Sequence, residues 1–347
     1  MSLVLITGIT GFLAAHCLDA VLDDPAGYRV RGTMRSKGKA EELLARFSSE
    51  QRSRIELVEV QDTASSDLTE AIKGVEYILH TASPYQPSVE DVERDLLKPA
   101  LDGTLNVLRY AQKEPAVKFV AITSSFAAIR NANKGGHLRP GFTYTEDDWN
   151  PSTVEEAKQQ GGLFAYAVSK ALAEKGAWDF VREQKPHYKI AAFNPPMIYG
   201  PTLQPSGKSK SSLNTSSKGI YALISGLDAM PEDKLPLFCH GRDVADAHVR
   251  AIAKLNEGGA DRRWLLCGGT FTWGMAVKHI AKTHPELKDR LPKGWESAEE
   301  KDLGQFAKLD SRPAQQVLGI KFRDWKVTLD ESIDSLLELE KGSQWEA

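Results

Sequence analysis

Tyr166 and Lys170 are the residues of this sequence whose types and spacing point most directly to proton chemistry. They stand four positions apart in a pattern that predicts a helix over residues 164–184, so both side chains share one helix face. A phenol, with a pKa of about 10, is a poor acid or base at neutral pH, but a neighbouring ammonium favours its phenolate form. The pair could therefore exchange a proton with a bound molecule, although such a pair also arises by chance.

Ser125 is a third candidate and belongs to a different segment. The apolar run 118–123 predicts a buried strand, and Ser124 and Ser125 follow at its carboxyl end, where ligands bind in open α/β sheets. Ser125 could donate a hydrogen bond to a carbonyl oxygen and to the alkoxide that develops as hydride arrives. The plain structural interpretation is a serine that ends a strand. Together with Tyr166 and Lys170, however, it predicts hydride transfer coupled to proton transfer.

A glycine-rich turn near the amino terminus predicts a dinucleotide site. It follows an apolar strand over 3–6 and precedes a helix over 12–22, which is the context that such a motif requires. Gly8 allows a tight turn, Gly11 lets the backbone approach a pyrophosphate, and the helix end offers free N–H groups. The residues that we expect at the phosphates are Thr7, Gly8, Thr10, Gly11, Phe12 and Leu13.

The end of the second predicted strand indicates which dinucleotide binds. A protein that prefers NAD usually places a carboxylate there for the ribose 2′-hydroxyl. This sequence has Arg35, Ser36 and Lys39 instead, with no carboxylate before Glu41. Arg35 could fork onto a 2′-phosphate, and its neighbours could add a contact. The alternative is a solvated basic turn. The pattern favours NADPH/NADP+ over NADH.

Strands that alternate with helices must position these residues. This alternation predicts an α/β fold, a doubly wound parallel Rossmann sheet with a smaller, mostly helical C-terminal lobe. We expect Pro99 to kink or unwind the fourth helix. The expected strands cover residues 3–6, 28–33, 55–60, 75–80, 118–123 and 189–193, and the expected helices cover 12–22, 38–47, 68–72, 89–112 and 164–184.

The pattern changes after residue 193, and we expect two domains. Residues 1–190 form the NADP-binding domain, with a returning segment at about 240–267, and residues 191–239 and 268–347 form a substrate lobe at the sheet's carboxyl edge. The Ser- and Lys-rich stretch 207–218 is expected to be a mobile loop, followed by a helix from about residue 220. With the connection 130–163 it should overhang the site, and we expect residues 205–218 to close on ligand binding.

The composition, with 41% hydrophobic and 26% charged residues, is that of a soluble globular chain. A formal charge of −3, from 44 Lys+Arg against 47 Asp+Glu, leaves no basic excess for nucleic-acid phosphates. Cys17, Cys239 and Cys267 suit a reducing compartment, and we interpret them as packed or idle thiols. No run approaches the length of a membrane span, and residues 1–22 do not resemble a secretory signal. We expect a cytoplasmic monomer or homodimer with a small-molecule partner, no nucleic-acid or membrane partner, and no metal.

With these residues assembled, the sequence resembles an extended short-chain dehydrogenase/reductase. More narrowly, it is similar to the fungal aldehyde/ketone and methylglyoxal reductases and to the related plant dihydroflavonol and cinnamoyl-CoA reductases. The likeness covers nearly the whole chain. It rests on the segments 7–14, 80–84, 123–125, 149–151, 166–170, 194–201 and 242–248.

The resemblance implies a role for each matching residue. Ser125, Tyr166 and Lys170 match the catalytic residues, and Arg35 matches the 2′-phosphate site. Asp243 is interpreted as the cap of a helix. The tyrosine is preceded by 162–165, Gly-Leu-Phe-Ala, which differs from the signature of the cinnamoyl-CoA reductases and argues against a CoA thioester. The remaining cofactor residues implied are Asp62 and Thr63 near the adenine, Thr81, Ala82 and Ser83 along the groove, and Pro195, Met197 and Ile198 beside the nicotinamide.

Apolar and aromatic residues that flank the motifs are the expected walls of a substrate pocket, which favours an uncharged, partly hydrophobic carbonyl substrate. These residues are Tyr85, Phe126, Ile129, Phe164, Met197 and Tyr199. The function expected is NADPH-dependent reduction of an aldehyde or ketone with the tyrosine as proton donor. Two alternatives stay open: a nucleotide-sugar epimerase or dehydratase of the same superfamily, which would recycle a tightly held NAD, and a non-catalytic NADP-sensing protein.

Overall fold

The structure is a computed structural model that describes residues 1–83, 89–205 and 209–342. Its centre is a seven-stranded sheet in the order β10-β7-β5-β4-β1-β2-β3, with every neighbouring pair parallel. The chain fills β1, β2 and β3 on one side and then turns to β4 on the other, so the topological switch point lies between β1 and β4. The strands are β1 (Leu3–Thr7), β2 (Arg29–Met34), β3 (Ile55–Glu59), β4 (Tyr77–His80), β5 (Phe119–Thr123), β7 (Lys189–Asn194) and β10 (Arg262–Leu265).

Helices cover both faces of this sheet, because successive side chains of a strand point to opposite faces. In β1, Val4 and Ile6 pack under α1, α2, α9 and α11, whereas Leu3 and Leu5 pack under α4, α5 and α7. The doubly wound Rossmann fold is therefore confirmed. The helices are α1 (Phe12–Asp23), α2 (Lys37–Leu44), α3 (Ser49–Ser53), α4 (Thr69–Ile72), α5 (Lys98–Lys113), α6 (Val154–Gln160), α7 (Gly162–Gln184), α9 (Gly241–Ala253) and α11 (Arg312–Val317).

The expected distortion at Pro99 is present and takes the form of a π-helical turn, Glu93–Leu97, directly before α5. Pro99 stands in the first turn of α5, where a residue without an N–H removes no required hydrogen bond. The α-helical hydrogen bonding therefore starts afresh at Lys98, and the regular helix is shorter than the range 89–112 expected from the sequence.

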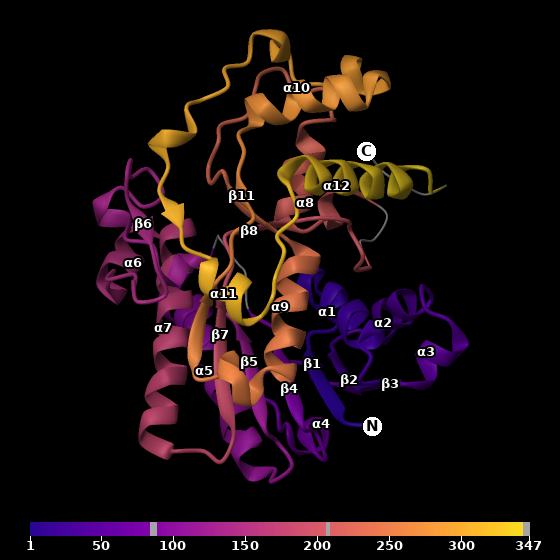
Figure 1. Ribbon diagram of the computed structural model, residues 1–347, viewed down its shortest axis with the longest axis vertical. Helices are drawn as coiled ribbons and strands as arrows, with labels where there is room; N and C mark the ends of the chain where they lie inside the picture. The colour runs from indigo at the N-terminus through magenta and orange to yellow at the C-terminus, as the bar shows by residue number, and fades with distance from the viewer. Residues whose placement is uncertain (84–88, 206–208, 343–347) are drawn as a thin grey trace.

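A smaller lobe lies at the carboxyl edge of the sheet, opposite to the end where the N-terminus starts β1 (Figure 1). It contains a second, three-stranded sheet in the order β11-β9-β8. Apolar residues of this sheet and of its helices form a separate core. The chain then returns to the main sheet, because β10 pairs with β7 after the lobe strand β9. The lobe elements are β8 (Met197–Tyr199), β9 (Leu237–His240), β11 (Gly269–Thr270), α8 (Thr215–Ala222), α10 (Trp273–Thr283) and α12 (Trp325–Glu340).

Two further short strands, β6 (Thr143–Tyr144) and β12 (Lys308–Leu309), pair in parallel beside the main sheet. Residues 207–218 are expected to form a loop, but the helix α8 already begins at Thr215. Ser216 and Ser217 are buried, and the Ser217 hydroxyl lies 3.1 Å from that of Thr202. The first turn of α8 is thus packed through polar side chains. The sequence there lacks the apolar periodicity from which a helix is predicted. Residues 206–208 of the expected loop lie outside the described residues.

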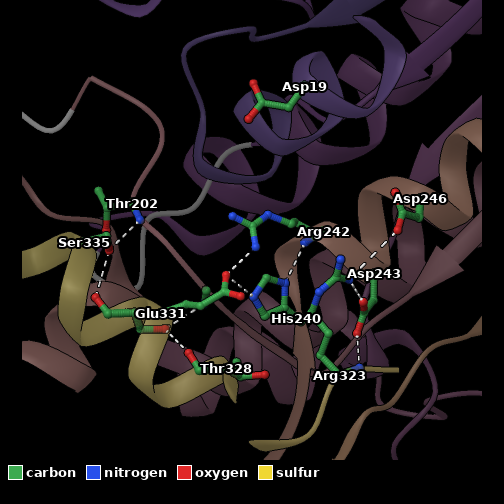
Figure 2. A network of polar contacts seen from close by, with 12 residues as sticks. Asp19, Thr202, His240, Arg242, Asp243, Asp246, Arg323, Thr328, Glu331 and Ser335 are labelled. Carbon is green, nitrogen blue, oxygen red and sulfur yellow. Dashed lines mark hydrogen bonds and ion pairs between the residues drawn. The ribbon is translucent and has the colours of Figure 1, made fainter. Parts of the chain in front are cut away.

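The helix α12 is tied to the start of α9 by polar contacts that Figure 2 shows. Glu331 of α12 accepts a hydrogen bond from the Arg242 guanidinium. One turn further along α12, Ser335 accepts a hydrogen bond of 2.9 Å from the backbone N–H of Thr202. The first contact joins the lobe helix α12 to α9, which covers the main sheet, and the second ties α12 to the segment that follows β8 within the lobe.

The expectation that Asp243 caps a helix is wrong. The cap of α9 is His240, whose Nδ1 accepts a hydrogen bond of 3.0 Å from the Arg242 N–H. The buried Asp243 carboxylate instead accepts hydrogen bonds from the Arg323 guanidinium and from the Arg323 N–H, the latter at 2.8 Å. A sequence pattern does not reveal this change, because Arg323 is brought to the site only by the fold (Figure 2).

The three cysteines are free thiols, as expected. Cys17 and Cys239 are fully buried, and burial raises the pKa of both. Burial also raises the pKa of Cys267 to about 11. A thiol in its neutral form is inert. No helix in the described part of the chain is both long and apolar enough to cross a membrane.

Candidate active site

The structure brings Ser125, Tyr166 and Lys170 to the carboxyl end of β5. Ser125 follows β5 and caps the short 3-10 turn Phe126–Ala128, and its Oγ accepts a hydrogen bond of 3.1 Å from the Ala127 N–H. Because this N–H occupies one lone pair of the oxygen, the Ser125 O–H remains able to donate to another acceptor. Tyr166 lies in the first turn of α7, which packs against the same 3-10 turn. Both side chains are partly buried.

Lys170 reaches from α7 to the ends of two strands. Its Nζ donates a hydrogen bond of 2.9 Å to the Thr123 carbonyl, the last residue of β5, and one of 3.4 Å to Ser83 Oγ, which lies beyond β4. Burial lowers the pKa of Lys170 to about 8, and the nearby Glu174 carboxylate partly opposes this shift. The ammonium is therefore held at the strand ends, on the face of α7 that also carries Tyr166. Its lowered pKa lets it gain or lose a proton near neutral pH.

A buried polar network supports these residues from below. Glu174, one turn beyond Lys170 on α7, accepts hydrogen bonds from the Ser124 hydroxyl, from Asn194 Nδ2 at 2.7 Å and from Arg263 Nε at 2.5 Å. Asn194 Nδ2 also donates to the Ser125 carbonyl at 3.1 Å. The Ser124 hydroxyl is therefore engaged in the interior, whereas the Ser125 hydroxyl, the second of the pair, makes no contact with Glu174.

Sequence reasoning missed this network, although part of it left a signal. Tyr166, Lys170 and Glu174 recur at four-residue spacing, so Glu174 could have been placed on the same face of the helix. Arg263 gave no such signal, because it lies 89 residues from Glu174 in sequence and meets it only through the pairing of β10 with β7.

The glycine turn has the geometry that a pyrophosphate needs. Gly8 has a φ of +67°, a conformation that favours glycine, and its N–H donates a hydrogen bond of 2.9 Å to Thr33 Oγ1. A Cβ on Gly8 would lie 3.2 Å from the Ala82 Cβ across the switch point. The helix α1 starts after Gly11 with no side-chain cap, so the first N–H groups, including those of Phe12 and Leu13, can face a phosphate. Thr10 lies in the turn and is partly buried. These features fit a dinucleotide.

Thr7 and Thr81 hold the end of β1 to the end of β4, next to the glycine turn. The Thr7 hydroxyl accepts hydrogen bonds from the N–H groups of Thr81 (3.1 Å) and Ala82 (3.0 Å) and lies 2.9 Å from His80 Nδ1. Burial lowers the pKa of His80 to about 3, so the ring that shares this hydrogen bond with Thr7 is neutral. The Thr81 hydroxyl donates to the Thr7 carbonyl at 2.6 Å. Both side chains thus lock β1 to β4 and leave the backbone to face the ligand.

Exposed groups surround the place expected for the adenosine. Arg35 is exposed at the end of β2 and makes no side-chain hydrogen bond or ion pair with any residue that the structure describes. Ser36 caps α2 by accepting a hydrogen bond of 3.5 Å from the N–H of Lys39, whose side chain is exposed. Asp62 shapes the turn after β3 and accepts from the Ala64 N–H at 3.0 Å. The neighbouring Thr63 is partly buried.

Three residues of the expected pocket wall are buried. Phe126, Ile129 and Tyr199 expose only 1%, 0% and 5% of their surface, because they pack in apolar cores on either side of the site. In this structure these three side chains therefore have almost no surface that a substrate could contact. Phe164 and Met197 are partly buried and keep some accessible surface.

The remaining predicted residues take different positions. Pro195 is buried, and its carbonyl accepts a hydrogen bond of 2.8 Å from the Phe126 N–H. Ile198 is partly buried and packs against the core of the main sheet. Tyr85 lies outside the described residues.

Comparisons with known proteins agree with this geometry. Residues 4–267 match the model of the NAD dependent epimerase/dehydratase family. The chain is 41% identical over 331 residues to an uncharacterized oxidoreductase of Schizosaccharomyces pombe, with 92% of each chain covered. It is 34% identical over 352 residues to the NADPH-dependent methylglyoxal reductase of Saccharomyces cerevisiae, with 97% of this chain and 98% of that one covered.

A solved structure is similar along the same length. The yeast methylglyoxal/isovaleraldehyde reductase complexed with NADPH matches with a TM-score of 0.85 and 31% identity, which covers 98% of this chain and 99% of that chain.

Proposed function

The chain belongs to the NAD dependent epimerase/dehydratase family, and from that premise we propose that it is an NADPH-dependent carbonyl reductase that converts an aldehyde or ketone to an alcohol. It is an extended short-chain dehydrogenase/reductase whose relatives include an NADPH-dependent methylglyoxal reductase. The observation that carries the proposal is the convergence of Ser125, Tyr166 and Lys170 at the end of β5, beside the glycine cradle.

The chain's own residues account for the proton and for the orientation of the substrate. NADPH, held along the glycine turn, supplies the hydride to the carbonyl carbon. The Ser125 hydroxyl donates a hydrogen bond to the carbonyl oxygen and stabilises the alkoxide as its charge grows. Tyr166 gives its phenolic proton to that oxygen, and the Lys170 ammonium stabilises the phenolate that remains. Lys170 also holds the ribose hydroxyls of the cofactor.

Oxidation of NADPH in the presence of a broad panel of aldehydes and ketones tests the proposal. We expect turnover with some of these carbonyls by the wild-type protein and its loss in Ser125→Ala. A protein that is isolated with tightly bound NAD and that turns over nucleotide sugars would support the epimerase alternative. A protein that binds NADPH but oxidises none of it across the panel would support the sensing alternative.

Arg35→Ala should weaken NADPH binding by about 30- to 100-fold and change NADH binding by less than about twofold, because only NADPH has a 2′-phosphate for the guanidinium to hold. Titration of the protein's fluorescence with each cofactor measures both dissociation constants. Arg29→Ala, at the opposite end of the same strand, is the matched control and should affect neither. Equal losses for the two cofactors in Arg35→Ala would remove Arg35 from the phosphate site.

The affinity for NADPH should fall as pH rises through about 8, the lowered pKa of Lys170. The protonated form of Lys170 holds the ribose hydroxyls more strongly, and a group with a lowered pKa loses its charge at a lower pH than a free lysine does. We expect the Kd to increase by about three- to tenfold from pH 7 to pH 9. In Lys170→Met the Kd should be higher at every pH and independent of pH over this range. A wild-type Kd that does not change would contradict this role.

We further propose that the protein works in the cytoplasm as a monomer or homodimer on a small-molecule substrate. Three free thiols in a chain of this length support a reducing compartment. Its near-neutral formal charge of −3 supports a small partner.

A further inference from the structure

We propose that Arg130 selects carbonyl substrates that carry a carboxylate, by pairing its guanidinium with that acidic group beside Tyr166. This inference rests on the proposed reductase function and names the class of substrate for the same site. It differs from the expectation of an uncharged substrate, and three of the six apolar residues on which that expectation depended, Phe126, Ile129 and Tyr199, lie in cores.

The backbone around Arg130 is fixed by several hydrogen bonds. Its N–H donates to the Phe126 carbonyl at 2.9 Å, and the N–H of Asn131 donates to the Tyr144 hydroxyl at 3.2 Å. Two residues earlier, the Ala128 carbonyl accepts a hydrogen bond of 2.9 Å from the Asn150 N–H. The segment that begins with the Ser125 cap is therefore rigid, and it presents Arg130 in a preorganised position.

The Arg130 side chain pairs with no acid in the part of the chain that the structure describes. The residue comes directly after the 3-10 turn and its cap Ile129, and the turn packs against α7, which carries Tyr166. The charge of Arg130 also contributes to the lowered pKa of His137. The side chain is partly buried, and burial lowers the pKa of Arg130, although a guanidinium stays charged in proteins. Among the described residues, no carboxylate approaches it within the 4.0 Å of an ion pair, and its nitrogens make no hydrogen bond.

A second arginine shows what a buried guanidinium normally requires. Arg263 is also buried, and it is paired with the Glu174 carboxylate and hydrogen-bonded to the carbonyls of Glu146 and Asp148. Arg130 has no such partners within the described chain, which leaves a positive charge with reduced solvation and nothing to balance it. A ligand carboxylate would supply both the charge and two acceptors for the planar fork.

The place of Arg130 identifies the ligand as the substrate and not the cofactor. Arg130 follows β5, whereas the pyrophosphate cradle follows β1 and Arg35 follows β2, further across the sheet. Arg130 follows the 3-10 turn that Ser125 caps, and this turn packs against α7, the helix that carries Tyr166, so the residue stands on the side of the sheet where the carbonyl would bind. The fitting substrate is therefore an oxo acid or an acidic aldehyde, with the carboxylate close enough to the carbonyl for both groups to be held together.

The experiment compares each acid with its neutral ester, so that intrinsic carbonyl reactivity cancels between variants. The pairs are benzoylformate with methyl benzoylformate and succinate semialdehyde with its methyl ester. The quantity measured is the ratio of kcat/KM for the acid to that for the ester with NADPH. For at least one pair we expect this ratio to fall by about 100-fold in Arg130→Gln, while Arg130→Lys recovers part of it.

Arg139→Gln is the matched control, because it removes a guanidinium from the same connection. Arg139 is stacked 3.4 Å from the Phe142 ring centroid and donates to the Tyr144 hydroxyl at 3.3 Å. It should change the acid-to-ester ratio by less than about twofold, since its guanidinium is already held by Phe142 and Tyr144 and does not pair with the substrate. A second experiment uses the wild-type enzyme alone and compares its inhibition constants for benzoate and for benzamide. Benzoate, which carries a carboxylate, is expected to inhibit more strongly.

Each contrary outcome has a distinct meaning. Equal losses for acid and ester in Arg130→Gln would show that Arg130 acts only through Tyr166, and would overturn the proposal. Wild-type inhibition by benzamide that equals or exceeds that by benzoate would overturn it as well, even if the variants do not fold. Either result leaves the reductase function standing, provided that the esters are reduced. If the wild-type protein reduces no carbonyl at all, the proposed function itself fails.

Discussion

Tyr166→Phe is expected to lower kcat for carbonyl reduction by about 10³-fold, while the Kd for NADPH changes by less than about twofold. The substitution removes one oxygen, and with it the only proton that the side chain can give to the alkoxide. The aromatic ring remains to pack against its neighbours, so the cradle for the cofactor should be unaffected. Steady-state oxidation of NADPH gives kcat, and a fluorescence titration gives the Kd.

Tyr188→Phe supplies the matched control for this experiment. Tyr188 is buried in the core between the sheet and the helices α4, α5 and α7, and its hydroxyl donates to the Leu108 carbonyl at 2.7 Å. Its loss should reduce stability modestly and leave kcat within about twofold. If Tyr166→Phe keeps more than about a tenth of the wild-type kcat, a proton donor other than Tyr166 is at work.

Glu174→Ala is expected to lower the free energy of unfolding by about 3–5 kcal/mol, because it leaves the Arg263 charge buried without its partner. The same change deprives Ser124 and Asn194 of a shared acceptor. Since Asn194 also holds the Ser125 carbonyl, activity should fall even in molecules that remain folded. Denaturation by urea measures the loss of stability, and kcat at a temperature where the variant is folded measures the loss of activity.

An exposed acid on the same helix provides the comparison. Glu183→Ala removes only a surface contact, 3.8 Å from Arg182, and should change the free energy of unfolding by less than about 0.5 kcal/mol. The double variant Glu174→Leu/Arg263→Leu should recover part of the stability, because it removes both charges together. A loss below about 1 kcal/mol in Glu174→Ala would mean that Arg263 needs no compensating acid.

Local patterns predicted the parallel sheet because each strand carries its own signal. Apolar runs bounded by turns located the strands, and the context of Gly8 and Gly11 located the phosphate cradle. The spacing of Tyr166 and Lys170 sufficed for the same reason, since one helix holds both residues.

Contacts between distant segments could not be predicted in this way. The Glu174–Arg263 pair and the Arg323–Asp243 pair depend on which strands and helices become neighbours. Burial was also beyond local reasoning: Phe126 and Tyr199 flank the catalytic motifs in sequence, yet they lie in cores. Arg130 was overlooked for a related reason. It stands out only because no acid pairs with it among the described residues, and a sequence pattern does not show which residues surround a side chain.

The return of the chain to the main sheet has a consequence for how the protein is made. β7 ends at Asn194, but its outer neighbour β10 is completed only at Leu265, after β8 and β9 have been placed in the lobe. On the ribosome, the growing chain therefore carries an unpaired strand edge while about seventy further residues are added, which invites pairing with other chains. Truncation before β10 should trap that state and yield an aggregating product, so the nucleotide-binding domain is not separable from the segment that interrupts it.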